Sequence, residues 1–328
     1  MRQIPFREAL REAMNEEMRR DDRVFLMGEE VAEYNGAYKV SQGMLAEFGP
    51  RRVIDTPISE LGFTAVAVGA AQNGLRPIVE FMTWNFAVLA LDQILNTASK
   101  MLAMSGGQVS CPIVLRGPNC SAGQLGAQHS TAFESLYANI PGLKVVSVSN
   151  GYDAKGLLKQ AIRYEEDPVI FMESEVMYGE KSEIPDEEYY IPLGKSFIKK
   201  EGTDITIVSF NKMMKVALGA AAELEKEGIS AEVIDLLTIR PLDWMTILES
   251  VKKTNRLMIV EEQWPFASVS SEIAYRIQKE GFDYLDAPIR RITAADAPLH
   301  YAPNLVAAAL PDVPRTVHLA KEIMYLRK

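Results

Sequence analysis

Hydrophobic and polar residues along the chain form two alternating kinds of segment. Short β-rich runs alternate with stretches whose apolar residues recur at helical spacing, which indicates strands followed by helices. The first predicted helix follows Pro5 and carries apolar residues from Phe6 to Met18 with charges between them. Further helices are predicted at 62–73, 84–105, 151–165, 212–227, 244–253, 267–280 and 315–327. Strands are predicted to begin near Val24, Arg52, Pro77, Pro112, Val145, Pro168, Ile205, Ala231, Arg256 and Ile289. This alternation predicts α/β folding, with a mainly parallel sheet covered on both faces.

A polar stretch at 178–196 interrupts the alternation. Its proline, glycine and acidic residues are typical of a linker. The strand–helix pattern then restarts, and a length of 328 residues suits two domains better than one. We therefore predict two doubly wound α/β domains, at 1–190 and 191–328, with the second smaller.

The net charge, the apolar runs and the cysteines narrow the kinds of partner and the compartment that we expect for this protein. With 35 basic against 44 acidic side chains the net charge is −9, which argues against nucleic acid as a partner. No run of 18 apolar residues and no apolar signal core near the amino terminus are present, so we expect no membrane association and an intracellular protein. Cys111 and Cys120 form no C-x-x-C pair and are interpreted as reduced thiols.

One predicted helix is apolar on nearly every face. Between Phe86 and Leu102 the only charged residues are Asp92 and Lys100. A helix of this kind must be buried on all sides. Burial inside its own domain is one interpretation. Burial against another subunit is the other, and we favour it because helices that cover a sheet normally keep one face in water.

Standard catalytic fingerprints are absent from the sequence. There is no G-x-G-x-x-G after a strand, no Walker P-loop, no G-x-S-x-G and no zinc-like spacing of cysteine and histidine. The chain therefore offers no standard phosphate-binding loop.

Four residues are candidates for chemistry because they lie where predicted strands end. Glu60 begins a small-residue helix after a strand, and His129 follows a glycine-rich loop after another strand. Met82 and Phe86 close a third strand and open the apolar helix. Ligand sites in α/β folds form at these strand ends. Each residue also has an interpretation without a catalytic role. Glu60 could simply be a carboxylate at the start of a helix, and His129 could be an exposed or structural imidazole. Met82 and Phe86 could pack in the core.

Several long motifs then resemble a known family in the same order along the chain. They are GEEVAEYNGAYKVSQG from Gly28, DTPISELGF from Asp55, EFMTWNF from Glu80, MSGG from Met104, RGPN from Arg116, AQHS from Ala127, PGLKVV from Pro141, LTIRPLD from Leu237 and VEEQWP from Val260. Together they resemble the beta subunits of thiamine-diphosphate-dependent pyruvate dehydrogenases, which belong to the transketolase-like enzymes. The resemblance extends over essentially the whole chain.

The resemblance implies a pyrimidine-binding domain followed by a transketolase C-terminal domain. It also implies thiamine diphosphate as cofactor, with the diphosphate and its Mg²⁺ held by a G-D-G motif that this sequence lacks. An alpha subunit would supply that motif in an α2β2 heterotetramer. The C-terminal domain would dock the dihydrolipoamide acetyltransferase core.

Residue roles follow from the same resemblance. Glu60 matches the glutamate that bonds N1′ of the aminopyrimidine and shares a proton with it. Met82 and Phe86 match the apolar seat of that ring, and Glu29 lies in a motif near the cofactor. His129 matches a histidine that assists acyl transfer to lipoyl-lysine.

A potassium site is also implied by the family. Ile113, Ala161 and Ile162 match residues that supply backbone carbonyls to the ion. The segment AIRYEEDPVI carries one extra residue compared with the family pattern, so Glu165 and Asp167 are included as further candidate ligands.

The activity implied is oxidative decarboxylation of pyruvate, with transfer of the acetyl group to lipoyl-lysine for acetyl-CoA synthesis. The protein would be active only with its alpha subunit, in the cytoplasm or an organelle matrix. Two alternatives stay open: a branched-chain 2-oxoacid or acetoin dehydrogenase beta subunit, and a non-catalytic docking subunit.

Overall fold

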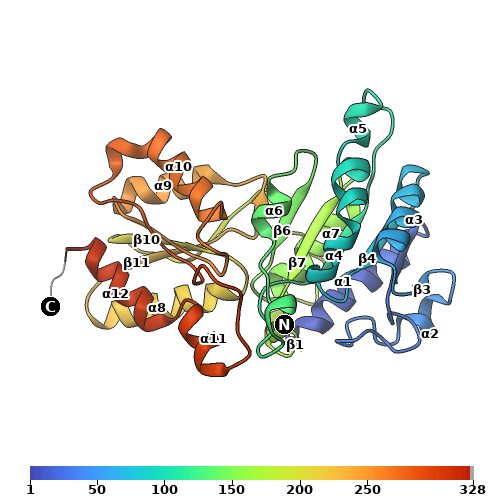
Figure 1. Ribbon diagram of the computed structural model, residues 1–328, viewed down its shortest axis with the longest axis horizontal. Helices are drawn as coiled ribbons and strands as arrows, with labels where there is room; N and C mark the ends of the chain where they lie inside the picture. Colours follow the sequence, from blue (N-terminus) through green and yellow to red (C-terminus); the bar gives the residue numbers. More distant parts are fainter. Residues whose placement is uncertain (326–328) are drawn as a thin grey trace. The chain divides into compact units, whose positions relative to one another are not determined.

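The computed structural model describes residues 1–325, which form two compact α/β units (Figure 1). The first unit comprises residues 1–119 and 136–193, and the second comprises residues 120–135 and the chain from 194 onward. The chain therefore changes units close to the predicted boundary. The segment 120–135 lies within the predicted first domain, and in the structure it packs with the second unit.

The first unit is built on a parallel sheet. Its strands run in the order β6-β7-β5-β4-β2-β3, and each neighbouring pair is parallel. The strands are β2 (Val24–Gly28), β3 (Val53–Asp55), β4 (Arg76–Glu80), β5 (Val114–Pro118), β6 (Lys144–Ser147) and β7 (Val169–Glu173). Every residue of β4, β5 and β7 is buried, as expected for parallel strands covered on both faces. All six strands confirm predicted ones.

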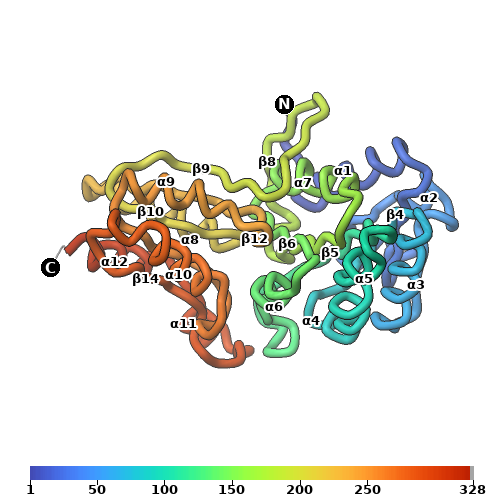
Figure 2. Tube along the Cα trace, turned by 90° about the horizontal axis from the view of Figure 1, so that it is seen from above, coloured from blue at the N-terminus to red at the C-terminus, as the bar shows by residue number. Residues whose placement is uncertain are grey.

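Helices cover both faces of this sheet. Figure 2 shows α1 and α7 on one side of it and α3, α4 and α5 on the other. The helices are α1 (Phe6–Arg20), α2 (Met44–Phe48), α3 (Glu60–Gln72), α4 (Trp84–Ala87), α5 (Met101–Met104), α6 (Glu134–Ala138) and α7 (Gly151–Arg163). Short helical turns are η1 (Val88–Ala90), η2 (Gln93–Ala98), η3 (Ala127–His129) and η4 (Glu175–Met177). Helix α6 begins at the end of the segment that belongs to the second unit.

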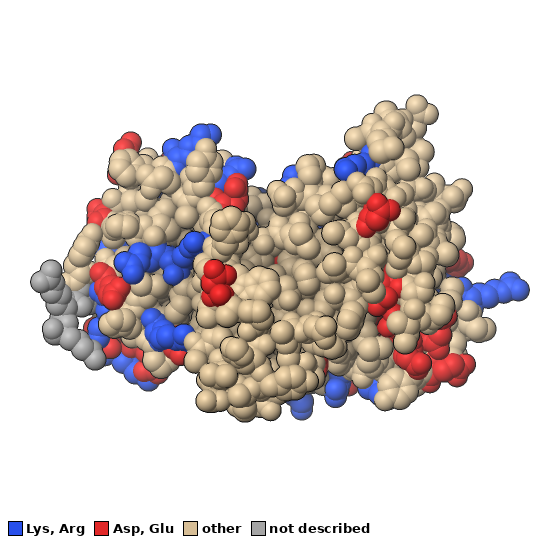
Figure 3. All heavy atoms as spheres, viewed as in Figure 1, with Lys and Arg blue, Asp and Glu red and all other residues tan. Residues whose placement is uncertain are grey.

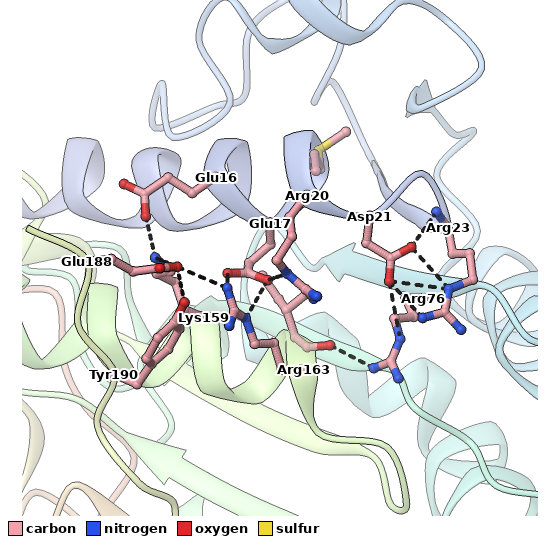
Figure 4. Close-up of polar contacts among 12 residues, drawn as sticks. Glu16, Glu17, Arg20, Asp21, Arg23, Arg76, Lys159, Arg163, Glu188 and Tyr190 are labelled. Atoms are coloured by element: carbon pink, nitrogen blue, oxygen red, sulfur yellow. Dashed lines mark hydrogen bonds and ion pairs between the residues drawn. The ribbon is translucent and has the colours of Figure 1, made fainter.

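Ion pairs fasten α1 to α7 (Figure 4). The Lys159 side chain is only 1% exposed, and its ammonium lies 2.5 Å from the Glu16 carboxylate and 3.1 Å from that of Glu188. One turn further along, Arg163 pairs with the buried Glu17 at 2.8 Å. A buried ammonium is tolerated only when carboxylates compensate it, so these pairs specify how the two helices align.

The predicted helix at 84–105 is broken into shorter pieces. Helix α4 is followed by the 3₁₀ turn η1, the π-helical turn η2 and the short helix α5. A π turn widens the helix, and such turns occur where packing or function demands a local change. Hydrophobic periodicity could not reveal the breaks, because apolar residues occur on nearly every face of this stretch.

The stretch at 178–196, predicted as a linker, contains a strand. Strand β8 (Lys181–Ile184) pairs antiparallel with strand β1 (Arg2–Pro5), and Arg2 lies opposite Ile184. Ile4 and Ile184 are buried together with Ala9. The pattern concealed this strand because three of its four residues are polar.

The second unit has a five-stranded sheet in the order β14-β13-β10-β11-β9. Four strands are parallel and β9 pairs antiparallel with β11. Helices α9 and α10 lie on one face and α8 and α12 on the other (Figure 1). The strands of this sheet are β9 (Phe197–Lys200), β10 (Ile205–Ser209), β11 (Ala231–Asp235), β13 (Leu257–Val260) and β14 (Arg290–Ile292), and the short strand β12 (Thr238–Arg240) lies outside it. The helices are α8 (Met214–Lys226), α9 (Trp244–Thr254), α10 (Val269–Gly281), α11 (Pro303–Ala309) and α12 (Val313–Ile323), with the turns η5 (Asn211–Met213) and η6 (Phe282–Tyr284).

The predicted C-terminal helix at 315–327 is observed as α12, and positions 326–327 lie outside the described residues. Within residues 1–325, none of the helices has the length and apolarity needed to cross a lipid bilayer.

Candidate active site

Two buried glutamates meet where strands β2 and β3 end. Glu29 directly follows β2, and Glu60 is the first residue of α3; they are 8% and 7% exposed. The pKa of Glu29 is raised from 4.5 to about 7, first by burial and then by the charge of Glu60 and a hydrogen bond with it. Oxygen Oε1 of Glu29 is buried and has no hydrogen-bond partner among the described residues. Two buried carboxyls in contact cannot both ionise cheaply, so the pair tends to retain a proton.

Backbone geometry explains why Glu29 is placed here. Gly28 ends β2 against β4, and a Cβ at this position would lie 2.5 Å from the carbonyl oxygen of Glu80. Asp55, at the end of β3, accepts hydrogen bonds from the backbone N–H groups of Ala32 (2.7 Å) and Glu33 (3.1 Å). The loop after Glu29 is therefore fixed by a residue that the sequence analysis did not single out.

Met82 lies in the connection from β4 into α4, and Phe86 lies within α4. The neighbouring Trp84 is fully buried and its Nε1–H donates to the Gly117 carbonyl at 3.0 Å. Phe86 is 39% exposed and Met82 is half-buried, so Phe86 is not a core residue in this chain. An anchored indole beside an accessible phenyl ring suits an apolar seat for a planar ligand.

The apolar helix predicted at 86–102 is only partly buried. Its residues Ala90, Ile94 and Ala98 are buried, whereas Leu89 is 62% exposed. Other exposed apolar residues on the same segment, on the neighbouring α3 and just before it are Val88, Met104, Leu61, Val66 and Ile58. Figure 3 shows few charged side chains over the α4–α5 segment. Burial within this chain therefore does not account for the apolar pattern.

A buried charge cluster lies beside these residues and was missed by the sequence analysis. Arg116 on β5 donates to Glu80 at the end of β4 and to Glu173 at the end of β7, the latter through Nε at 2.6 Å. Tyr178 donates its hydroxyl to Glu173 at 2.7 Å. Burial alone would lower the pKa of Arg116, but the two carboxylates raise it well above its usual value. The sequence did carry a signal for this cluster. Each of two apolar runs contains one charged residue, Glu80 in PIVEFM and Arg116 in PIVLRG.

His129 lies in the second unit, in the turn η3, and is half-buried. Its loop packs on that unit: a Cβ at Gly126 would lie 2.6 Å from the Tyr301 ring. Glu60 belongs to the first unit. The structure therefore brings Glu60 together with Glu29, and the catalytic role of His129 stays a prediction.

The residues predicted to hold potassium cluster around the end of α7. The Ile113 carbonyl accepts from Val169 N at 2.9 Å, the Ala161 carbonyl from Tyr164 N at 3.3 Å, and the Ile162 carbonyl from Arg76 at 3.0 Å. A carbonyl oxygen has two lone pairs, so each retains capacity for a cation.

The side chains of the two acidic candidates make ion pairs with cationic residues, and their part in a potassium site stays a prediction. Glu165 pairs with Arg76 at 2.7 Å, and Asp167 pairs with Lys144 at 2.7 Å. Figure 4 shows Arg76 beside Asp21 as well. Among residues 1–325 no group of three or more acidic, histidine or cysteine side chains could hold a metal ion.

Comparisons with known proteins now decide the family. Residues 2–181 match the transketolase pyrimidine binding domain and residues 194–315 the transketolase C-terminal domain. The chain is 56% identical to the pyruvate dehydrogenase E1 component subunit beta of Rickettsia felis over 323 residues, which is 98% of this chain and 99% of that one. This chain belongs to the family of pyruvate dehydrogenase E1 beta subunits.

Other relatives agree. The corresponding subunit of Rhizobium meliloti is 56% identical over 99% of this chain and 71% of its own length. The mitochondrial beta-1 subunit of Arabidopsis thaliana is 51% identical over 100% of this chain and 91% of its own length. A solved split gene transketolase has the same fold, with a TM-score of 0.81, 22% identity and coverage of 99% of this chain and 100% of that one. These matches confirm the predicted family and the two-domain α/β class.

The raised pKa of Glu29 predicts a pH-dependent contribution to stability. The folded chain binds this proton more tightly than the unfolded chain, so the contribution is complete below about pH 4.5 and is lost as the pH rises through about 7. Replacing Glu29 with Gln removes the titration. We expect the free energy of unfolding of Glu29→Gln, measured by chemical denaturation, to change less across this interval than that of the wild type.

The exposed neighbour provides the control for this measurement. Glu30→Gln leaves the Glu29 carboxyl in place, so the wild-type pH dependence should persist. Identical slopes for the wild type and Glu29→Gln would contradict the assignment of the titration to Glu29.

Proposed function

We propose that this chain is the beta subunit of a pyruvate dehydrogenase that decarboxylates pyruvate and transfers the acetyl group to lipoyl-lysine, for acetyl-CoA synthesis. The observation that carries the proposal is the pair of buried carboxyls, Glu29 and Glu60, at the strand ends of a pyrimidine-binding fold. The proposed setting is the cytoplasm or an organelle matrix.

The site fits the aminopyrimidine end of thiamine diphosphate. A carboxyl can bond a ring nitrogen, the Glu29 Oε1 atom is buried without a described partner, and Phe86 offers an accessible apolar face. Glu60 would hold a proton at N1′ of the ring, with Met82 and Phe86 beneath the ring. Burial and the neighbouring Glu60 both favour the protonated form of Glu29. The Glu29–Glu60 pair would therefore carry only one negative charge. When bound, thiamine diphosphate supplies the carbon nucleophile and electron sink for decarboxylation.

His129 would act after decarboxylation, when the acetyl group is transferred to lipoyl-lysine. An imidazole exchanges protons near neutral pH, so it can assist transfer of the acetyl group to the lipoyl thiol. We place it with Glu60 in the catalytic set by family resemblance.

An alpha subunit is the proposed partner. It would cover the exposed apolar residues of α3 and the α4–α5 segment, such as Val66 and Leu89, which are 65% and 62% exposed. Exposed apolar residues grouped in this way mark interaction sites. We propose an α2β2 heterotetramer in which the alpha subunit holds the diphosphate and Mg²⁺. The C-terminal domain of this chain would dock the acetyltransferase core.

Potassium is a separate proposal. Since Glu165 and Asp167 are paired with cationic side chains, the ligands proposed for the ion are the carbonyl oxygens of Ile113, Ala161 and Ile162. Arg76 and Lys144 would stabilise the loop between α7 and β7 with or without the ion.

Substrate preference tests the proposed activity. With the alpha subunit, Mg²⁺ and thiamine diphosphate, kcat/KM for pyruvate should exceed that for a branched-chain 2-oxoacid by at least about ten-fold, the discrimination that apolar pockets achieve for small differences in size. Equal or reversed values would assign the chain to the branched-chain type. The beta chain alone, given the same cofactors, should be inactive and is the control for contaminating activity.

A further inference from the structure

The loop that carries His129 is attached to the second unit at both of its ends. At the first end, the backbone N–H of Ser121 donates to Glu262 Oε1 at 2.7 Å. At the second end, Glu134 accepts a hydrogen bond from Gln263 Nε2 at 3.2 Å. Glu262 and Gln263 are consecutive residues just after β13, so one short connection holds both ends of a loop more than a hundred positions earlier in the chain.

A buried lysine reinforces the first attachment. Lys212 Nζ lies 2.8 Å from Glu262 and donates both to the Ser121 carbonyl and to the Ser121 hydroxyl, the latter at 2.6 Å. Lys212, Glu262 and Ser121 are 8%, 6% and 3% exposed. Moving an ammonium and a carboxylate out of water is costly, and such pairs persist only with good geometry and further hydrogen bonds. Here those further bonds go to the loop.

The interior of the loop makes its own contacts. Ser130 donates its hydroxyl to the Gly126 carbonyl at 2.7 Å, and His129 N donates to the same carbonyl at 3.2 Å. A cavity of about 20 Å³, enough for one water molecule, lies between Ser130 and Glu262. Next to Ser121, the backbone N–H of Cys120 donates to the Thr131 carbonyl at 3.2 Å, which ties the first end of the loop to the segment just after His129.

We infer that Lys212 and Glu262 are positioning residues, which hold the loop 120–135 and thereby place His129 for acyl transfer to lipoyl-lysine. This inference rests on the proposed role of His129. Neither residue belongs to the catalytic set, and both act through Ser121. Their effect should therefore fall on acyl transfer rather than on decarboxylation.

The test uses Lys212→Met in the full alpha–beta assembly. Loss of the charged hydrogen bonds to Ser121 should speed amide hydrogen exchange in residues 120–135 by about ten-fold or more. Acetylation of a free lipoyl domain should slow by about ten-fold in kcat, since misplaced catalytic groups cost rates of this order. Pyruvate oxidation by an artificial electron acceptor, which bypasses the lipoyl group, should stay within about two-fold of the wild type if the loop acts only in transfer.

Two further variants separate positioning from stability. Lys212→Met combined with Glu262→Gln leaves no unpaired buried charge, so its resistance to denaturant should recover relative to Lys212→Met. Its loop should still exchange faster than the wild type, because the bonds from Nζ to Ser121 remain absent. Lys226→Met is the matched control: its ammonium is exposed and pairs with Glu223 at 2.8 Å, so neither exchange nor transfer should change.

Unchanged exchange of the loop in Lys212→Met would overturn the inference. So would rapid exchange with undiminished acetyl transfer, provided that His129→Gln slows the transfer. If His129→Gln itself leaves acetyl transfer intact, the proposed role of His129 fails, and that result is distinct from a failure of Lys212 and Glu262 to hold the loop. Equal losses in both half-reactions would also count against selective positioning.

Discussion

Glu60→Gln is expected to lower turnover of the assembled enzyme by about 10²- to 10⁴-fold, the usual contribution of a positioned acid–base group. Glutamine keeps the shape of the side chain and can still form hydrogen bonds, but it cannot give or take a proton. The measurement is steady-state pyruvate oxidation by the reconstituted alpha–beta assembly, with assembly checked by size-exclusion chromatography.

The fold should tolerate this substitution. Glu60 lies beside a carboxyl whose protonation it favours, so replacing it removes an unfavourable charge contact rather than an ion pair. Glu33→Gln is the control, because Glu33 is an exposed carboxylate in the loop after Glu29. Turnover of Glu60→Gln within a few-fold of wild type would refute the proton-sharing role and favour a docking subunit without catalytic residues.

Arg116→Met should produce the largest loss of stability, about 3–5 kcal/mol in the free energy of unfolding, as when one partner of a buried ion pair is removed. Arg116 is fully buried and compensates Glu80 and Glu173, which are themselves 4% and 0% exposed. Without the guanidinium these carboxyls can be accommodated only by taking up protons. The measurement is urea denaturation of the beta chain near neutral pH.

Two comparisons make this prediction specific. Arg23→Met removes an exposed guanidinium, and Asp21 keeps Arg76 at 3.8 Å as a second cationic neighbour, so the substitution should cost less than about 1 kcal/mol. Arg116→Met combined with Glu80→Gln and Glu173→Gln should recover much of the loss, because amides need no counter-charge. Equal effects of Arg116→Met and Arg23→Met would show that the buried cluster does not stabilise the strand ends.

Most of the parallel strands could be predicted because they are short, largely buried apolar runs with distinct boundaries. The run VFLMG became β2 and ITIVSF became β10, with bounds within a residue or so. The antiparallel strands β1, β8 and β9 escaped prediction because their residues do not need to be apolar on both faces. Strand β8 has the sequence KSEI and β9 the sequence FIKK, and each pairs antiparallel with a distant segment.

The candidate site was likewise only partly predictable from the sequence. Glu60 and Phe86 could be identified because they stand at the ends of predicted strands and in motifs that resemble a family. The partnership of Glu60 with Glu29 depends on strands β2 and β3 lying side by side, which local pattern does not reveal. The role of Arg116 depends on partners 36 and 57 positions away.

The sequence by itself determined the α/β class, two domains, the family motifs and most strands of both sheets. These properties follow from local periodicity and from side-chain chemistry at strand ends. Only the tertiary structure decided that Glu29 shares its burial with Glu60, and that the loop of His129 belongs to the second unit. Both depend on contacts between segments far apart in the chain, because burial and charge compensation arise only when those segments pack together.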